Sequence, residues 1–160
     1  GEEIDRTVGY YQGPKKYKEK LEAIINGENT LALIEKEYNE NPDNVSAGME
    51  LAKKYQYMSK RDEAQKIYSH IITNCEEKAR KTTIPYYQDR QINAYELALF
   101  NRGINLWVTH DPHPFLEYIN QFPHGELTNR AYGWLGGFFA MTGYSDTTLI
   151  DSCTVKALDR

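Results

Sequence analysis

The 160-residue sequence has no hydrophobic run of the roughly 20 residues that a membrane-spanning helix needs. It also has only two cysteines, Cys75 and Cys153. They are far apart and form no C-x-x-C pair, so neither a zinc knuckle nor a redox pair is indicated. We expect a protein without a membrane span in which both thiols are buried or unreactive, with a disulfide left open.

Basic residues are scarce in the C-terminal half, where Lys156 is the only lysine after Lys81. The net charge is −4. A surface that follows a phosphate backbone needs clustered lysine and arginine, so we expect no nucleic-acid partner. Glycine-rich phosphate loops are also missing, because Gly133, Gly136 and Gly137 fall inside a predicted helix and do not follow a strand.

Residues suited to catalysis or metal binding are few. One histidine group has metal-like spacing, but its flanking prolines indicate a turn and a helix start, where Asp111 fits a helix N-cap. A zinc site also needs a clearer third ligand. No nucleophile, base and orienting group can be recognised together. We therefore predict no enzyme, no cofactor and no metal, including at His110, Asp111, His113 and His124.

Residues 44–74 carry the clearest structural pattern, that of two amphipathic helices. In the first half, small and apolar residues gather on one helical face: Ala47, Leu51, Ala52 and Tyr55. In the second half, the spacing i, i+3, i+4, i+7 is met by Ala64, Ile67, Tyr68 and Ile71. The short polar break at residues 59–61 leaves chain only for an antiparallel return. The segment is therefore predicted to be a helical hairpin.

This hairpin resembles a tetratricopeptide repeat, a helix-turn-helix unit of about 34 residues. The small and aromatic offsets of the repeat are met by Leu51, Ala52, Tyr55, Ala64 and Tyr68, whereas Gly48 and Glu76 depart from its first aromatic and closing proline. A second, degenerate repeat is similar at Tyr132, Leu135, Gly136 and Phe139. The resemblance implies an all-α fold of antiparallel helix-pair repeats in a right-handed superhelix. A generic antiparallel helix pair is the alternative.

The N-terminal segment resembles the closing strand and last helix of a thioredoxin-like domain, through Gly1, Glu2, Ile4, Val8, Gly9, Tyr17 and Leu21. The resemblance implies a remnant of such a domain over residues 1–27, a repeat domain over 28–160, and a bacterial periplasmic or cytoplasmic location. The alternative is an irregular N-terminal arm. A strand at residues 3–10 without its sheet has an unpaired edge, so we expect it to fray or to pair with a second copy in a homodimer.

The remaining helices follow from apolar periodicity and from proline, glycine and cap residues. A solvated helix or linker is expected over residues 76–83. Residues 104–108 should pack down before a turn at His110 and Asp111. The predicted helices are 14–26, 29–40, 85–102 (closed by Gly103), 112–122, 126–142 and 146–158.

The resemblance to a tetratricopeptide repeat implies a binding groove lined by the first helix of each pair. Polar and adaptable positions away from the hairpin seam are then candidates: Met49, Lys53, Gln56, Tyr57 and, on the helix over 85–102, Arg90. Such grooves bind extended or helical peptides; ordinary solvated surface is the alternative. We predict a protein-interaction module. Alternatives are an accessory region that shapes the active site of a thiol-disulfide oxidoreductase, and a spacer or dimerising element.

Overall fold

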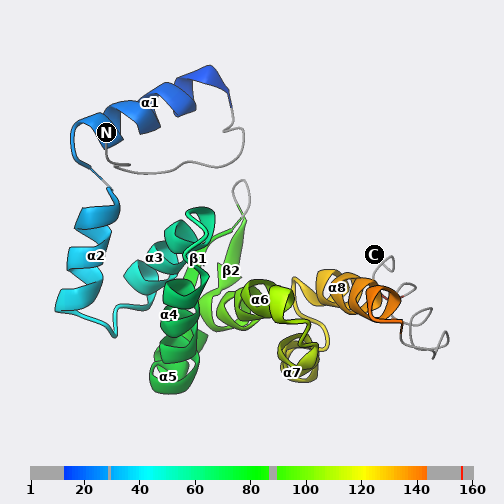
Figure 1. Cartoon of the computed structure of the whole chain (residues 1–160). Coiled ribbons are helices and arrows are strands. Elements are labelled where there is room, and N and C mark those ends of the chain that lie inside the picture. The colour runs from blue at the N-terminus through cyan, green and yellow to red at the C-terminus, as the bar shows by residue number, and fades with distance from the viewer. Residues whose placement is uncertain (1–12, 29, 87–89, 144–155, 157–160) are drawn as a thin grey trace.

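The computed structural model describes residues 13–28, 30–86, 90–143 and 156. The expected strand at 3–10 and the expected helix at 146–158, except residue 156, lie outside this part of the chain. The described part is mostly helical, with one two-stranded sheet, and it contains no helix long and apolar enough to cross a membrane. Successive helices run from α1 at one end of Figure 1 to α8 at the other.

The first four helices match the sequence prediction closely: α1 Pro14–Ile25, α2 Leu31–Glu40, α3 Val45–Tyr57 and α4 Arg61–Asn74. Two of them are capped by side chains, and the cap at Thr30 was one of two predicted from the sequence, Asn29 or Thr30. The Thr30 hydroxyl accepts from the backbone N–H of Leu33, and the Asn44 side chain accepts from that of Ala47. The helix after Pro14 is thus followed by two helices with defined starts.

The predicted hairpin is confirmed by α3 and α4, which pack against each other along their apolar faces. Ala52, Ala64 and Tyr68 are fully buried in this seam. A Cβ atom on Gly48 would lie 3.0 Å from Cε2 of Tyr38 in α2. The glycine that departs from the repeat pattern therefore gives α2 the space to pack on α3.

The prediction of a helix that starts at Pro85 is wrong. Strand β1, Thr83–Pro85, instead pairs antiparallel with β2, Gln91–Asn93, with Ile84 opposite Ile92. Both isoleucines are buried, so the alternating pattern of strands takes precedence over the helical one. The Asn93 side chain then accepts from two backbone N–H groups and starts α6, Ala94–Leu106.

Gly103 was predicted to close that helix, which is also wrong, because α6 continues through it. A Cβ atom at Gly103 would lie 2.9 Å from the ring of Phe115 in α7, His113–Gln121. The glycine therefore serves close approach of a neighbouring helix instead of a helix end.

The other elements are α5, Glu76–Lys81, the 3-10 helix η1, Trp107–Thr109, and α8, Thr128–Met141. Figure 1 shows α6 in the middle of the chain's path, between the α3–α4 hairpin and the α7–α8 pair. One continuous hydrophobic core extends from Leu31 to Phe139. It holds the candidate groove helix, α3, in a fixed position.

Two buried tyrosines tie this core together. Tyr68 donates to Oε1 of Gln56 at 2.8 Å, and Tyr118 donates to Oε1 of Glu96 at 2.7 Å. Neither ring is exposed. Burial raises the pKa of Tyr68, and burial together with the hydrogen bond to Glu96 raises the pKa of Tyr118. Both hydroxyls therefore stay protonated in the folded protein when exposed tyrosines ionise.

The raised tyrosine pKa values predict loss of stability in alkali. Below the ordinary tyrosine pKa of 10.0 both states are protonated, and the stabilisation is complete. As the pH rises through this value, the unfolded tyrosines lose protons that the folded ones keep, so the free energy of unfolding falls, with a slope that approaches about 1.4 kcal/mol per pH unit for each tyrosine. Urea melts between about pH 9 and about pH 11 should show a fall of about 1.4 kcal/mol for each tyrosine, and Tyr68→Phe should reduce it by one tyrosine's share. An equal slope in the variant would contradict the assignment.

Candidate functional site

A cavity of about 770 Å³ lies between α1, α3, the β-hairpin and α6. Helix α3 supplies the largest share of the lining, and β1 and α6 supply most of the rest. Its lining comprises Ala23, Ile24, Glu28, Ser46, Met49, Glu50, Lys53, Lys54, Gln56, Tyr57, Thr83, Ile84, Pro85, Tyr86, Leu97 and Asn101. The side of α3 that faces away from the hairpin seam is therefore hollowed into a groove.

Four of the five residues predicted for a groove line this cavity: Met49, Lys53, Gln56 and Tyr57. They come together because helical spacing places all four on one side of α3. Arg90 does not line it. It precedes β2 instead of lying on a helix, and its guanidinium pairs with Glu126.

The floor of the groove is apolar with one fixed amide. Met49, Ile84 and Leu97 are 3%, 8% and 7% exposed. The Gln56 amide accepts from the Tyr68 hydroxyl and donates to the backbone oxygen of Asn101 at 3.4 Å. These bonds hold the amide in one orientation. The floor can therefore receive an apolar group beside a polar one.

The rim carries aromatic rings and charges of both signs. Tyr57 and Tyr86 are half-buried, and the Lys53 Nζ lies 5.9 Å from the centre of the Tyr57 ring. Two carboxylates and two ammonium groups share the rim, so it has no dominant sign of charge: Glu28, Glu50, Lys53 and Lys54. Such a rim does not select a strongly charged ligand.

Sequence reasoning missed the part of the groove that β1 and α6 supply. Ile84 precedes the segment that was predicted to be helical from Pro85, and Leu97 and Asn101 lie within that segment. The available signal in the sequence was a single apolar residue between polar ones, Ile92 between Gln91 and Asn93, which fits the alternation of a strand. It is short, and it did not indicate that the β-hairpin would reach α3.

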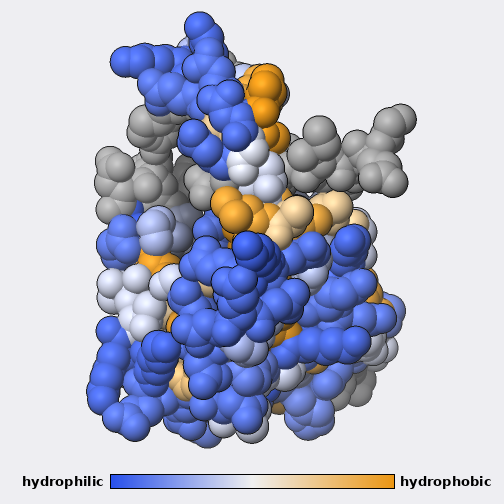
Figure 2. All heavy atoms as spheres, turned by 90° about the vertical axis from the view of Figure 1, so that its left-hand side faces the viewer, coloured by the Kyte–Doolittle hydropathy of each residue, from blue (hydrophilic) through white to orange (hydrophobic). Residues whose placement is uncertain are grey.

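Helix α1 closes the groove with Ala23 and Ile24 but leaves most of its apolar stripe uncovered. Tyr17, Leu21 and Ile25 are 45%, 38% and 81% exposed. In Figure 2, one part of the molecule projects at the top of the view. Hydrophobic residues are gathered where this part joins the larger part below, whose visible face is mostly hydrophilic. Among the described residues, nothing packs on the outer side of this stripe closely enough to bury it.

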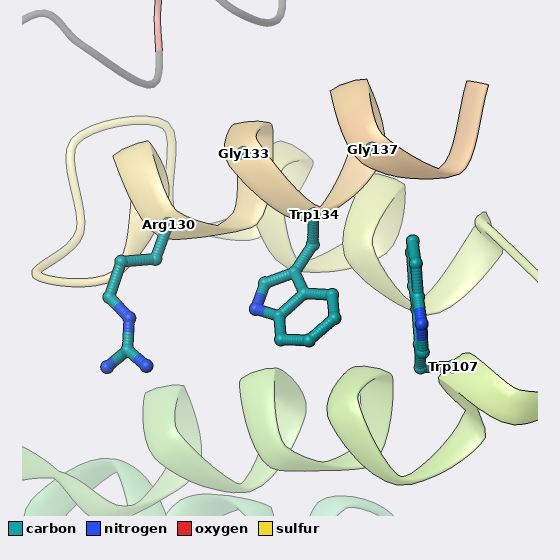
Figure 3. A pocket seen from close by; sticks show the side chains of 5 residues that line it. All are labelled: Trp107, Arg130, Gly133, Trp134 and Gly137. Carbon is teal, nitrogen blue, oxygen red and sulfur yellow. The ribbon is translucent and has the colours of Figure 1, made fainter. Parts of the chain in front are cut away.

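A second, shallower hollow of about 420 Å³ lies on α8. Figure 3 shows Arg130 and Trp134 extending from α8 on the side where Trp107 lies. The two indole rings meet edge to face at 4.8 Å, and Arg130 lies over the Phe100 ring and bonds to the Tyr86 hydroxyl. These side chains pack α8 onto α6, so we assign the hollow to packing.

His110, His113 and His124 are exposed, and among the described residues none of them belongs to a group of three converging ligand atoms. Asp111 accepts from the backbone N–H of His113, but the N-cap of α7 is Pro112, so the prediction of Asp111 as the N-cap is wrong by one residue. In the described part of the chain, ligand atoms of this kind converge elsewhere, at Asp43, His70 and Cys75.

Comparison of the chain with protein-family models, with curated proteins and with solved structures finds no match.

Proposed function

We propose that this chain is a non-catalytic protein-interaction domain of tetratricopeptide-like helix pairs, whose groove along α3 binds a peptide segment of a partner. The observation that carries the proposal is that Met49, Lys53, Gln56 and Tyr57, chosen by their positions on one helix, line a single cavity of about 770 Å³. Packing of successive helices from α2 to α8 supports the stacked-pair architecture, because such pairs bury their apolar faces only against neighbours.

The chemistry of the groove favours a peptide with one apolar anchor. Ligand cavities typically measure about 300–1,000 Å³ and combine apolar walls with a few placed polar groups. Here Met49 and Leu97 offer the apolar floor, and Gln56 offers a fixed amide for a peptide backbone. The tyrosines of the rim add aromatic contact area with little loss of side-chain entropy.

A second candidate is an accessory region that shapes the active site of a thioredoxin-like redox domain. The exposed stripe of Tyr17, Leu21 and Ile25 on α1 favours it, since a helix of this kind packs on the sheet of such a domain. The two functions are separated by the reductase activity of the parent protein with and without residues 28–160. An accessory role changes turnover of small disulfide substrates, whereas partner binding leaves it unchanged.

Blocking the groove should abolish peptide binding. Ser46 is exposed at the groove edge, so Ser46→Trp would fill the cavity without removing a core contact. Lys53→Glu reverses the charge beside Tyr57. Against a peptide selected from a random-sequence display library, each variant is expected to raise the Kd at least about tenfold, a loss of about 1.4 kcal/mol. Fluorescence anisotropy with labelled peptide measures this.

Matched controls lie on α4, away from the groove. Thr73 and Lys66 are both exposed there and do not line the cavity. Thr73→Trp and Lys66→Glu repeat the same changes in size and charge, and should bind the peptide as the unaltered chain does. Equal weakening by groove and control variants would reject the groove, as would selection of no binding peptide.

A further inference from the structure

Three potential metal ligands converge at one end of the α3–α4 hairpin, outside the groove. Oδ1 of Asp43 lies 3.2 Å from Nε2 of His70 and 3.4 Å from Sγ of Cys75. All three atoms lie within 4.8 Å of one another. The three residues come from separate places in the chain: the turn before α3, the body of α4 and the end of α4.

These spacings fit a zinc ion. Zinc binds nitrogen and oxygen at about 2.0–2.2 Å and sulfur at about 2.3 Å, so ligand atoms of a tetrahedral site lie about 3.3–3.7 Å apart. Both short distances from Asp43 Oδ1 are within about 0.1 Å of this range. Only the distance between the ligand atoms of His70 and Cys75 has to shorten. An ion placed between the three atoms would attract both of these atoms.

The surroundings hold the ligands while leaving a way in. Cys75 is 5% exposed, whereas the His70 and Asp43 side chains are 30% and 68% exposed. The Nζ of Lys78 donates to the backbone oxygen of Asp43 at 2.6 Å and fixes the turn. An ion can thus enter from the Asp43 side, and water can complete the coordination there.

Hydrogen bonds and burial shift the pKa values of two of the three groups. Hydrogen bonds from Cys75 and then His70 lower the pKa of Asp43. Burial, with the nearby carboxylate, raises the pKa of the Cys75 thiol. The charged and titratable groups that face the cluster are Lys78 and the Tyr38 hydroxyl.

We propose that Asp43, His70 and Cys75 form a binding site for Zn²⁺, with water as the fourth ligand. On binding, the Cys75 S–H loses one proton to solvent and the thiolate sulfur bonds to the metal. His70 binds through Nε2, and its single ring proton, which Nε2 donates to Asp43 in the free cluster, moves to Nδ1. The carboxylate and thiolate together balance the two positive charges of the ion. No electron is transferred.

Titration of the whole chain with Co²⁺, followed by competition with Zn²⁺, tests the site. Cobalt bound by a thiolate gives a near-ultraviolet charge-transfer band, which reports sulfur ligation directly. We expect one equivalent of Co²⁺, displacement by Zn²⁺, release of one proton per ion, and tighter binding as the pH rises. His70→Ala and Asp43→Asn should each weaken binding at least about tenfold.

Cys75→Ser should abolish the band, while the matched controls Cys153→Ser and His124→Ala should keep it. If Cys75→Ser does not fold, as judged by circular dichroism, the His70 and Asp43 variants decide the outcome, because both side chains are partly exposed. Absence of the band in the unaltered chain would overturn the proposal and leave a hydrogen-bonded cap of the hairpin. Loss of the band in Cys153→Ser, or its full retention in His70→Ala and Asp43→Asn, would also overturn it.

Discussion

Replacing Tyr68 by alanine is expected to lower the free energy of unfolding by about 3–5 kcal/mol, as for other large aromatic residues cut to alanine in a core. Tyr68 is fully buried on α4, which packs against both α3 and α6. Its loss would leave a cavity at that junction and would free the Gln56 amide and the Asn101 side chain. Urea denaturation monitored by circular dichroism measures the change.

Two comparisons isolate the cause. Tyr68→Phe keeps the ring and removes only the hydroxyl, so it should cost about 1 kcal/mol. Tyr17→Ala removes a ring that is 45% exposed on α1 and should change stability by less than about 0.5 kcal/mol. A loss of less than about 1 kcal/mol for Tyr68→Ala would show that α4 does not share a packed interior with its neighbours.

Tyr118→Phe should lower the free energy of unfolding by about 2–3 kcal/mol, more than most losses of a single hydroxyl. The Glu96 carboxylate is only 6% exposed and accepts from Tyr118 at 2.7 Å. Without the hydroxyl, Oε1 of Glu96 is left with the longer hydrogen bond from the backbone N–H of Leu127, at 3.4 Å. A buried carboxylate that loses its main donor is costly.

A double-mutant cycle with Glu96→Gln tests this explanation. The amide is uncharged, so removal of the Tyr118 hydroxyl should cost less beside it, with a coupling of at least about 1 kcal/mol between the two changes. The backbone of Gly125 packs closely against this pair, because a Cβ atom on Gly125 would lie 2.6 Å from Oε1 of Glu96. Simple additivity of the two changes would contradict the account.

The helical hairpin and most helix starts could be predicted from the sequence because local signals agree there. Ala64, Ile67 and Tyr68 repeat at helical spacing, and all three are buried in the seam. Asn44, an N-cap, precedes the apolar run and accepts from Ala47. Short-range periodicity and capping are both visible in a single chain.

The β-hairpin was missed because Pro85 suits the first turn of a helix as well as the end of a strand. Asn93, with Glu96 three residues later, has the spacing of a helix start and could have placed α6 correctly. In the structure Glu96 points into the core toward Tyr118 instead of back to the cap. Gly103 was misread as a helix end because its partner, Phe115, lies on another helix.

The groove on α3 could be predicted from the sequence in part, whereas the cluster of Asp43, His70 and Cys75 could not. Residues on α3 share a face through helical spacing alone, so Met49, Lys53 and Tyr57 could be grouped from the sequence. Asp43 lies 27 and 32 positions from His70 and Cys75. Only the antiparallel return of α4 brings them together, and no local pattern marks that meeting.

The central claim is that the face of α3 away from its seam receives a peptide. Two-dimensional ¹H–¹⁵N correlation NMR spectra of the chain, recorded with and without a peptide selected from the display library, test this claim most directly. We expect changes in amide chemical shift concentrated on five residues that line one cavity: Met49, Lys53, Tyr57, Ile84 and Leu97. Shifts confined to the hollow around Trp107 and Trp134, or spread evenly over the surface, would contradict it.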